Sequence, residues 1–138
     1  MTIQEENKDL FEYADEMPLA HCISSDYVMG AGIAVPMAEK FNLRPVLEKL
    51  GKNKYPDCIY MNNVFSLVTK KYASDKPSYE NFEKSLWKMK KIVKFFNIKQ
   101  VAMPRIGCGL DQLEWRVVKK IIEKIFIDTD LKIFVCYL

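Results

Sequence analysis

Four of the five glycines stand in two G-x-G pairs, Gly30-Ala31-Gly32 and Gly107-Cys108-Gly109. Glycine allows positive φ and lets a ligand approach the backbone amides with no side chain in the way. Amides at the start of a helix also favour anions. Two such loops side by side would form a cradle for a phosphate or diphosphate. The alternative is that these glycines only serve tight turns.

Two common phosphate-binding fingerprints do not fit the chain. A dinucleotide-binding G-x-G-x-x-G needs a third glycine, but Val35 and Gln112 stand at those positions. A P-loop is also excluded, because Asn53 follows Gly51-Lys52 where a serine or threonine is required. We therefore expect neither ATP hydrolysis nor nicotinamide chemistry.

Histidine and cysteine restrict the remaining chemistry. The one histidine, His21, is interpreted as a partly buried strand residue with its hydrogen bonds satisfied, rather than as a catalyst. The cysteines Cys22, Cys58, Cys108 and Cys136 lie far apart with no C-x-x-C spacing, so no metal site is expected. Cys22 and Cys136 fall in predicted strands and are assigned to the core.

Size and composition indicate one domain, residues 1–138, with 49% hydrophobic residues and a net charge of +3. The chain has neither a signal-peptide pattern nor an apolar run of membrane-spanning length, so we expect a cytoplasmic protein with reduced thiols. The net charge is too small to indicate a nucleic-acid binder. The lysines between Pro77 and Asn97 are interpreted as a solvated helix face, with nucleic-acid contact as the alternative.

Apolar residues spaced three and four apart predict two strong helices, from Tyr79 to Phe96 with Ser78 as N-cap, and from Trp115 to Ile125. Trp87 and Trp115 are expected in or near the core. Weaker patterns predict helices over Ala31–Phe41 and Arg44–Leu50, the second ended by Gly51.

Short apolar and β-branched runs between the helices predict strands. They cover Leu19–Ile23, Cys58–Met61, Val64–Thr69, Val101–Met103 and Leu131–Tyr137, with Thr2–Glu6 as a possible edge strand. Asn62-Asn63 tolerates the positive φ of a two-residue hairpin turn, so the strands that it joins are expected to be antiparallel. The fold class is α/β, with a mixed, mostly parallel sheet and helices on both faces. Each glycine pair follows a strand and opens a helix, where ligands bind in such sheets.

Four segments together resemble a macrodomain, most closely the branch that contains the terminal ADP-ribose protein glycohydrolase. They are His21-Cys22-Ile23-Ser24, Met29 to Val35, Thr69-Lys70-Lys71 and Pro104 to Asp111, within a similarity that extends from about Asp9 to Leu138. The resemblance implies one macrodomain, residues 1–138, that binds ADP-ribose and hydrolyses it from modified macromolecules.

The resemblance also implies residue roles. Lys70 matches the nucleophile of this branch, and Asp111 its acid/base partner. Asp9 matches the residue that holds the adenine amino group, although Lys8 precedes it where the family usually has glycine. The implied ADP-ribose contacts are Asp9, Leu10, Ser24, Met29, Gly30, Ala31, Gly32, Ile33, Ala34, Val35, Arg105, Ile106, Gly107, Cys108, Gly109, Leu110 and Leu138.

The chemistry is consistent with these residue types. A lysine must lose its proton before it can attack, and partial burial at a strand end favours the neutral form. Lys70 would attack the anomeric carbon of the distal ribose and expel a carboxylate, and Asp111 would move protons and assist release of the lysyl adduct. The alternatives are a solvent-exposed strand-end lysine, and an N-cap role for Asp111, which can coexist with catalysis.

We therefore expect a monomeric hydrolase that removes mono-ADP-ribose from glutamate and aspartate side chains of proteins, and deacylates O-acetyl-ADP-ribose, with no cofactor and no metal. The alternatives are a module that binds ADP-ribose without hydrolysing it, and a hydrolase that acts on ADP-ribosylated thymidine in DNA.

Overall fold

The central sheet has six strands in the order β1-β6-β5-β2-β4-β3. The computed structural model describes residues 1–51 and 53–138. The strands are β1 (Thr2–Asn7), β2 (Leu19–Ser24), β3 (Asp57–Met61), β4 (Val64–Lys70), β5 (Gln100–Met103) and β6 (Lys132–Tyr137). Neighbouring strands are parallel except β3 and β4. The predicted mixed, mostly parallel sheet is confirmed, and β1 is the predicted edge strand.

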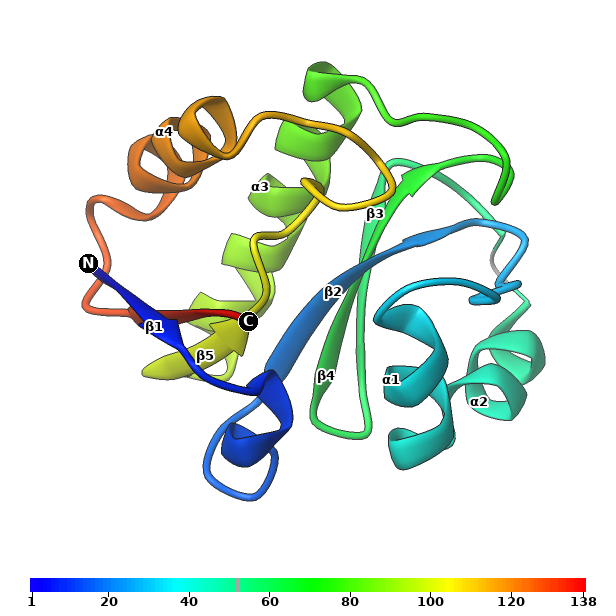
Figure 1. Ribbon diagram of the computed structural model, residues 1–138, viewed down its shortest axis with the longest axis horizontal. Coiled ribbons are helices and arrows are strands. Elements are labelled where there is room, and N and C mark those ends of the chain that lie inside the picture. The colour runs from blue at the N-terminus through cyan, green and yellow to red at the C-terminus, as the bar shows by residue number, and fades with distance from the viewer. Residues whose placement is uncertain (52) are drawn as a thin grey trace.

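Helices cover both faces of the sheet, as predicted. They are α1 (Ala34–Phe41), α2 (Leu43–Leu50), α3 (Tyr79–Phe95) and α4 (Trp115–Phe126), with a short 3-10 helix, η1 (Leu10–Tyr13), which was not predicted. Figure 1 shows α3 and α4 on one side of the sheet and α1 and α2 on the other. The two buried clusters divide in the same way, and η1, which contacts β5 and β6, contributes to the cluster under α1 and α2.

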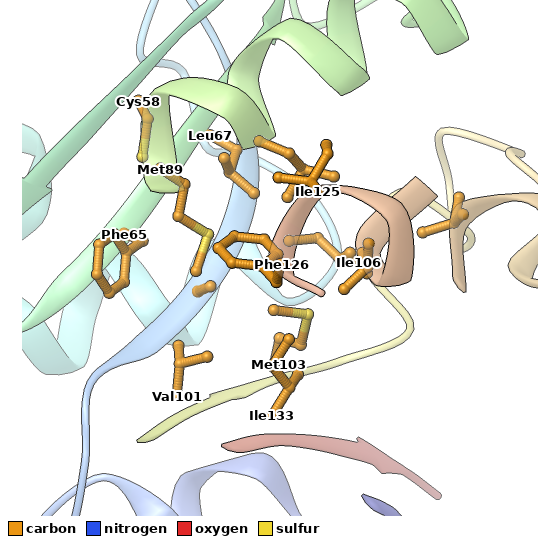
Figure 2. Close-up of a cluster of buried hydrophobic side chains, with 14 of the residues drawn as sticks. Cys58, Phe65, Leu67, Met89, Val101, Met103, Ile106, Ile125, Phe126 and Ile133 are labelled. Carbon is orange, nitrogen blue, oxygen red and sulfur yellow. The ribbon is translucent and has the colours of Figure 1, made fainter. Parts of the chain in front are cut away.

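Alternating side chains of β4 supply both cores. Phe65 and Leu67 belong to the cluster under α3 and α4, whereas Val64 and Val68 belong to the cluster under α1 and α2. This division follows because successive strand residues point to opposite faces. Figure 2 shows the first cluster, in which Phe126 of α4 lies among side chains from α3 and the sheet. Each fully buried large apolar side chain contributes about 1.5–3 kcal/mol.

Local sequence signals determine several boundaries. The Ser78 side chain accepts a hydrogen bond from the Asn81 amide at 3.1 Å and caps α3. Gly51 ends α2 with φ +67°, and its amide donates to the Leu47 carbonyl. Asn62 and Asn63 both have positive φ and turn β3 into β4. All three predictions are confirmed.

Three expectations for the helices are corrected. Trp87 is 41% exposed, and Phe96, expected on the buried face of α3, is 58% exposed just after the helix ends. The first glycine pair does lead into α1, but α4 begins only at Trp115, so the second pair opens a loop rather than a helix.

None of the helices in the described part of the chain is long and apolar enough to cross a membrane.

Candidate active site

A cavity of about 1000 Å³ opens at the carboxyl ends of the parallel strands. Ser24, Lys70, Pro104 and Tyr137, which end or directly follow β2, β4, β5 and β6, all line it. Ligands bind at this edge of open α/β sheets, because loops from neighbouring strands converge there. The volume is at the upper end of the range of about 300–1,000 Å³ that is usual for small-molecule sites.

The cavity brings together both glycine pairs and the two predicted catalytic residues. Of the predicted ADP-ribose contacts, all but one line it. The exception is Val35, which lies in the first turn of α1 and is not a lining residue, so its predicted contact role is not supported. The glycine pairs are 77 positions apart in sequence, counted from Gly30 to Gly107, and only the sheet makes them neighbours.

Lys70 and Asp111 form an ion pair inside this cavity. Lys70 Nζ lies 2.7 Å from Asp111 Oδ1, and both side chains are only 13% exposed. The interpretation of Lys70 as a merely solvent-exposed lysine is therefore wrong. A carboxylate at this distance can accept a proton from the ammonium group directly.

A bulge in β4 determines where Lys70 points. Ile23 pairs with Val68, but the next residue, Ser24, pairs with Lys70, so Thr69 is an extra residue on β4. Strand side chains alternate between the two faces of a sheet, so one inserted residue reverses the side to which the next residue points. Thr69 is fully buried, and its hydroxyl has no hydrogen-bond partner among the described residues.

The loop from Pro104 to Glu114 carries Asp111. Gly107 has φ +76°, and an added Cβ would lie 3.0 Å from Leu113 Cδ1, so this turn requires glycine. The Leu113 amide donates to the Gly107 carbonyl at 2.9 Å. The N-cap of α4 is Glu114, so the predicted N-cap role of Asp111 is wrong, and its carboxylate serves the cavity instead.

The first glycine loop is held in a strained conformation. Tyr27 and Met29 both have positive φ, at 57° and 45°, although neither is glycine. Arg44 of α2 donates to the carbonyls of Tyr27 and Val28 and thereby supports this turn. Such strain is typical of functional loops that the surrounding structure fixes in place.

Asp26 links this loop to the segment that follows Lys70. Its carboxylate accepts hydrogen bonds from Ser24 Oγ, the Val28 amide and the Ala73 amide. Partial burial raises the pKa of Asp26, but these hydrogen bonds outweigh it, so the pKa is lowered overall. The loops after β2 and β4 therefore act as one wall of the cavity.

At the far end of the cavity, Asp9 is the N-cap of η1. Its Oδ1 accepts from the Phe11 amide at 2.9 Å, and the Glu12 side chain accepts from the Asp9 amide. Lys8, which precedes Asp9, directs its ammonium group over the Tyr13 ring at 3.9 Å. Both Lys8 and Asp9 line the cavity.

Arg105 lies between the glycine loop and the C-terminal strand. Its guanidinium group stacks on the Tyr137 ring at 4.2 Å and approaches Glu5 of β1 at 3.7 Å. Glu5 also accepts from Lys119 and Trp115, and the Lys119 hydrogen bond is the largest factor that lowers the pKa of Glu5. Leu138, at the rim beside Tyr137, is 93% exposed.

Solved structures share this fold over nearly the whole chain. The macrodomain of Mycobacterium tuberculosis DarG superposes with a TM-score of 0.87 at 20% identity, covering 99% of this chain and 98% of that one. The macrodomain of Thermus aquaticus DarG gives 0.84 at 19% identity, covering 99% of each chain. At these identities the likeness concerns the fold alone.

Sequence relatives decide the family, although no family model matches the chain. The human protein named ADP-ribose glycohydrolase OARD1 is 45% identical over 132 residues, which cover 92% of this chain and 86% of the relative. The bovine protein of that name is 44% identical with the same coverage. This chain belongs to the ADP-ribose glycohydrolase branch of the macrodomains.

Histidine and cysteine in this macrodomain are not placed as nucleophiles. His21 is fully buried, its Nε2 lies 2.7 Å from Ser66 Oγ, and burial lowers its pKa to about 3, so it is neutral. Cys22 and Cys108 line the cavity, but burial raises the pKa of both thiols, that of Cys108 to about 11. Cys22 is therefore a wall residue rather than a fully buried core residue, whereas Cys136 is buried and also reaches the cavity.

Sequence reasoning missed part of the macrodomain's cavity wall. The additional lining residues are Lys8, Phe11, Cys22, Ile23, Pro36, Ala73, Ser74, Lys76, Pro104, Cys136 and Tyr137. Most of them are close in sequence to residues that were predicted to contact ADP-ribose. Ala73, Ser74 and Lys76 form a separate group, for which the one available signal is that their polar segment follows Lys70 directly.

Proposed function

We propose that this macrodomain is a hydrolase that removes mono-ADP-ribose from glutamate and aspartate side chains of proteins. The observation that carries the proposal is the Lys70–Asp111 pair, 2.7 Å apart and largely shielded from water in a cavity flanked by two glycine loops. The names of the human and bovine relatives support the same reaction class.

In the proposed complex, the adenine lies at the Asp9 end of the cavity and Leu138 closes over it. The diphosphate lies between the glycine loops, whose amides would stabilise its charge. The distal ribose would then reach Lys70, because β4, which ends at Lys70, follows β5 and β2, the strands that lead into the glycine loops, in the order of the sheet. The predicted contacts other than Val35 remain our assignment for ADP-ribose.

The reaction begins with proton transfer from the Lys70 ammonium group to the Asp111 carboxylate. The neutral amine attacks the anomeric carbon of the distal ribose, a carbon–nitrogen bond forms, and the bond from that carbon to the ester oxygen breaks. The electron pair of that bond leaves with the glutamate or aspartate carboxylate, which needs no protonation to depart at neutral pH.

Water then hydrolyses the lysyl-ADP-ribose adduct. Asp111, after passing its first proton to solvent, acts as the base that activates water at the same carbon. The carbon–nitrogen bond breaks with the electron pair returning to Lys70, and the proton taken from water passes from Asp111 to the Lys70 amine. ADP-ribose leaves and the ion pair is restored. O-acetyl-ADP-ribose fits the same scheme, with acetate as the leaving group. We expect the protein to act as a monomer in the cytoplasm.

The decisive experiment is a release assay on a protein that carries mono-ADP-ribosyl glutamate, together with calorimetry with ADP-ribose. Wild type should release and bind ADP-ribose, whereas Lys70→Ala should bind it without release. A wild type that binds but releases nothing would instead support a module that only recognises ADP-ribose. A parallel substrate with ADP-ribosylated thymidine in DNA tests whether nucleic acid is the preferred target.

A further inference from the structure

Hydrogen bonds connect the segment that carries Asp111 to Lys70 and to the chain that follows Lys70. Lys70 Nζ meets Asp111 Oδ1 at 2.7 Å. Lys76 Nζ donates to the Leu110 carbonyl at 2.5 Å. The Glu114 amide donates to the Tyr79 hydroxyl at 2.9 Å.

Asp111 lies in an irregular loop with an exposed tip. Between Gly107 and Glu114 the chain forms no helix or strand, and Leu110 at its tip is 62% exposed. Within the loop, the Leu113 amide donates to the Gly107 carbonyl, and the Gln112 amide donates to the Gly109 carbonyl across a turn centred on the Leu110–Asp111 peptide. The carbonyl of that central peptide accepts from Lys76, outside the loop. Gln112 has φ +66°, an unfavourable conformation for a residue with a Cβ.

Lys76, in contrast, extends from a well-anchored part of the chain. It directly precedes Pro77, which is buried, and Ser78, which caps α3. At the other end of the same connection, the Ser25 amide donates to the Lys70 carbonyl at 2.9 Å and the Ala73 amide donates to Asp26. Both ends of the connection are therefore fixed, and the hydrogen bond from Lys76 ties the Leu110 carbonyl to them.

We propose that Lys76 is a positioning residue that holds Asp111 against Lys70, an inference that rests on the proposed hydrolase mechanism. The carbonyl that Lys76 binds belongs to the peptide group joining Leu110 to Asp111, so the bond restricts rotation of the backbone that carries the carboxylate. Tyr79 supports the same segment three residues further on, at Glu114.

The mechanism predicts which step depends on Lys76. Asp111 takes the proton before attack and activates water afterwards, and neither step is needed for ADP-ribose to bind. Loss of the hydrogen bond should therefore lower kcat and slow hydrolysis of the adduct on Lys70, while the affinity for ADP-ribose changes little. A charge-assisted hydrogen bond at an exposed site corresponds to an effect of roughly 5- to 10-fold.

The test compares Lys76→Met with Lys76→Arg, with Lys91→Met as a control on the exposed face of α3. The measurements are kcat and KM for release from ADP-ribosyl glutamate, the ADP-ribose dissociation constant, and the fraction of adduct on Lys70 by intact-protein mass spectrometry during turnover. Thermal unfolding establishes that each variant is folded.

We expect Lys76→Met to lose kcat by roughly 5- to 10-fold and to accumulate adduct, with the ADP-ribose dissociation constant within about 2-fold of wild type. Lys76→Arg should recover most of kcat, because a guanidinium group can also donate to the carbonyl. Unchanged kcat and adduct in Lys76→Met would overturn the inference. Weaker ADP-ribose binding with no adduct would also overturn it and make Lys76 a ligand contact. A wild type without activity or adduct would contradict the proposed function itself.

Discussion

The side chain of Leu110 lies on Gly32, so the two glycine loops touch across the cavity. A Cβ built at Gly32 would lie 3.2 Å from Leu110 Cδ1, and Gly32 has φ +60°. The contact joins the loop after β2 to the loop that carries Asp111. Because Gly32 has no side chain, Leu110 can approach it closely. This contact sets the distance between the two glycine loops, and therefore the size of ligand that fits between them.

Gly32→Ala should weaken ADP-ribose binding by roughly an order of magnitude and destabilise the fold by about 1 kcal/mol. The added methyl group is strained at this φ and pushes Leu110 away from the first loop. Calorimetry with ADP-ribose and thermal unfolding would measure the two effects. Gly109→Ala is the matched control for stability, because a Cβ there meets nothing within 4 Å and φ is not positive, so its unfolding should match wild type.

Asp111→Asn should reduce ADP-ribose release by about 10²- to 10⁴-fold, the usual range for loss of a general acid–base group. The amide preserves the size of the side chain but cannot take the proton of Lys70. Adduct on Lys70 should persist longer than in wild type, which intact-protein mass spectrometry can measure. Release at the wild-type rate would remove Asp111 from the mechanism and leave it a structural partner of Lys70.

Thr69→Val should leave the free energy of unfolding unchanged or raise it by about 1 kcal/mol, because the buried hydroxyl lacks a hydrogen-bond partner in the described structure. Valine has nearly the same shape, so the bulge and the direction of Lys70 should persist and release should stay near the wild-type rate. Denaturant unfolding with a parallel release assay would decide this. A clear loss of stability would indicate that the hydroxyl has a partner, such as buried water.

His21 should make the fold less stable as the pH falls from about 6.5 towards 5. Its folded pKa is lowered to about 3, so only the unfolded chain takes up a proton in this range, and protonation favours unfolding. The expected slope is at most about 1.4 kcal/mol per pH unit.

Most carboxylate titration falls below this window, so the difference in slope between wild type and a variant without the imidazole gives the contribution of His21. Unfolding free energies from denaturant titrations at several pH values would measure it, with His21→Gln as the comparison. Glutamine can still reach a hydroxyl but does not titrate, so the variant should lose the slope. An equal slope in both proteins would contradict the prediction.

The elements that could be predicted depend on interactions between residues close in sequence. The Ser78 cap, the Asn62-Asn63 turn and the Gly51 terminator each involve a few neighbouring residues, whose φ preferences and hydrogen-bonding groups decide the outcome. The resemblance to a known family identified Lys70 and Asp111, which the fold then brought to 2.7 Å.

By itself, the sequence determined the strands, the helices and the residue types at the ends of the strands. The tertiary structure alone decided that a bulge at Thr69 directs Lys70 into the cavity, that Val35 is not among its lining residues, and that Lys76 binds the loop of Asp111. Each of these outcomes depends on register and contacts between segments that are distant in sequence. The register between strands determines which face of the sheet each side chain occupies. A local pattern of residue types contains no information about that register, because the register is set only when the strands pair.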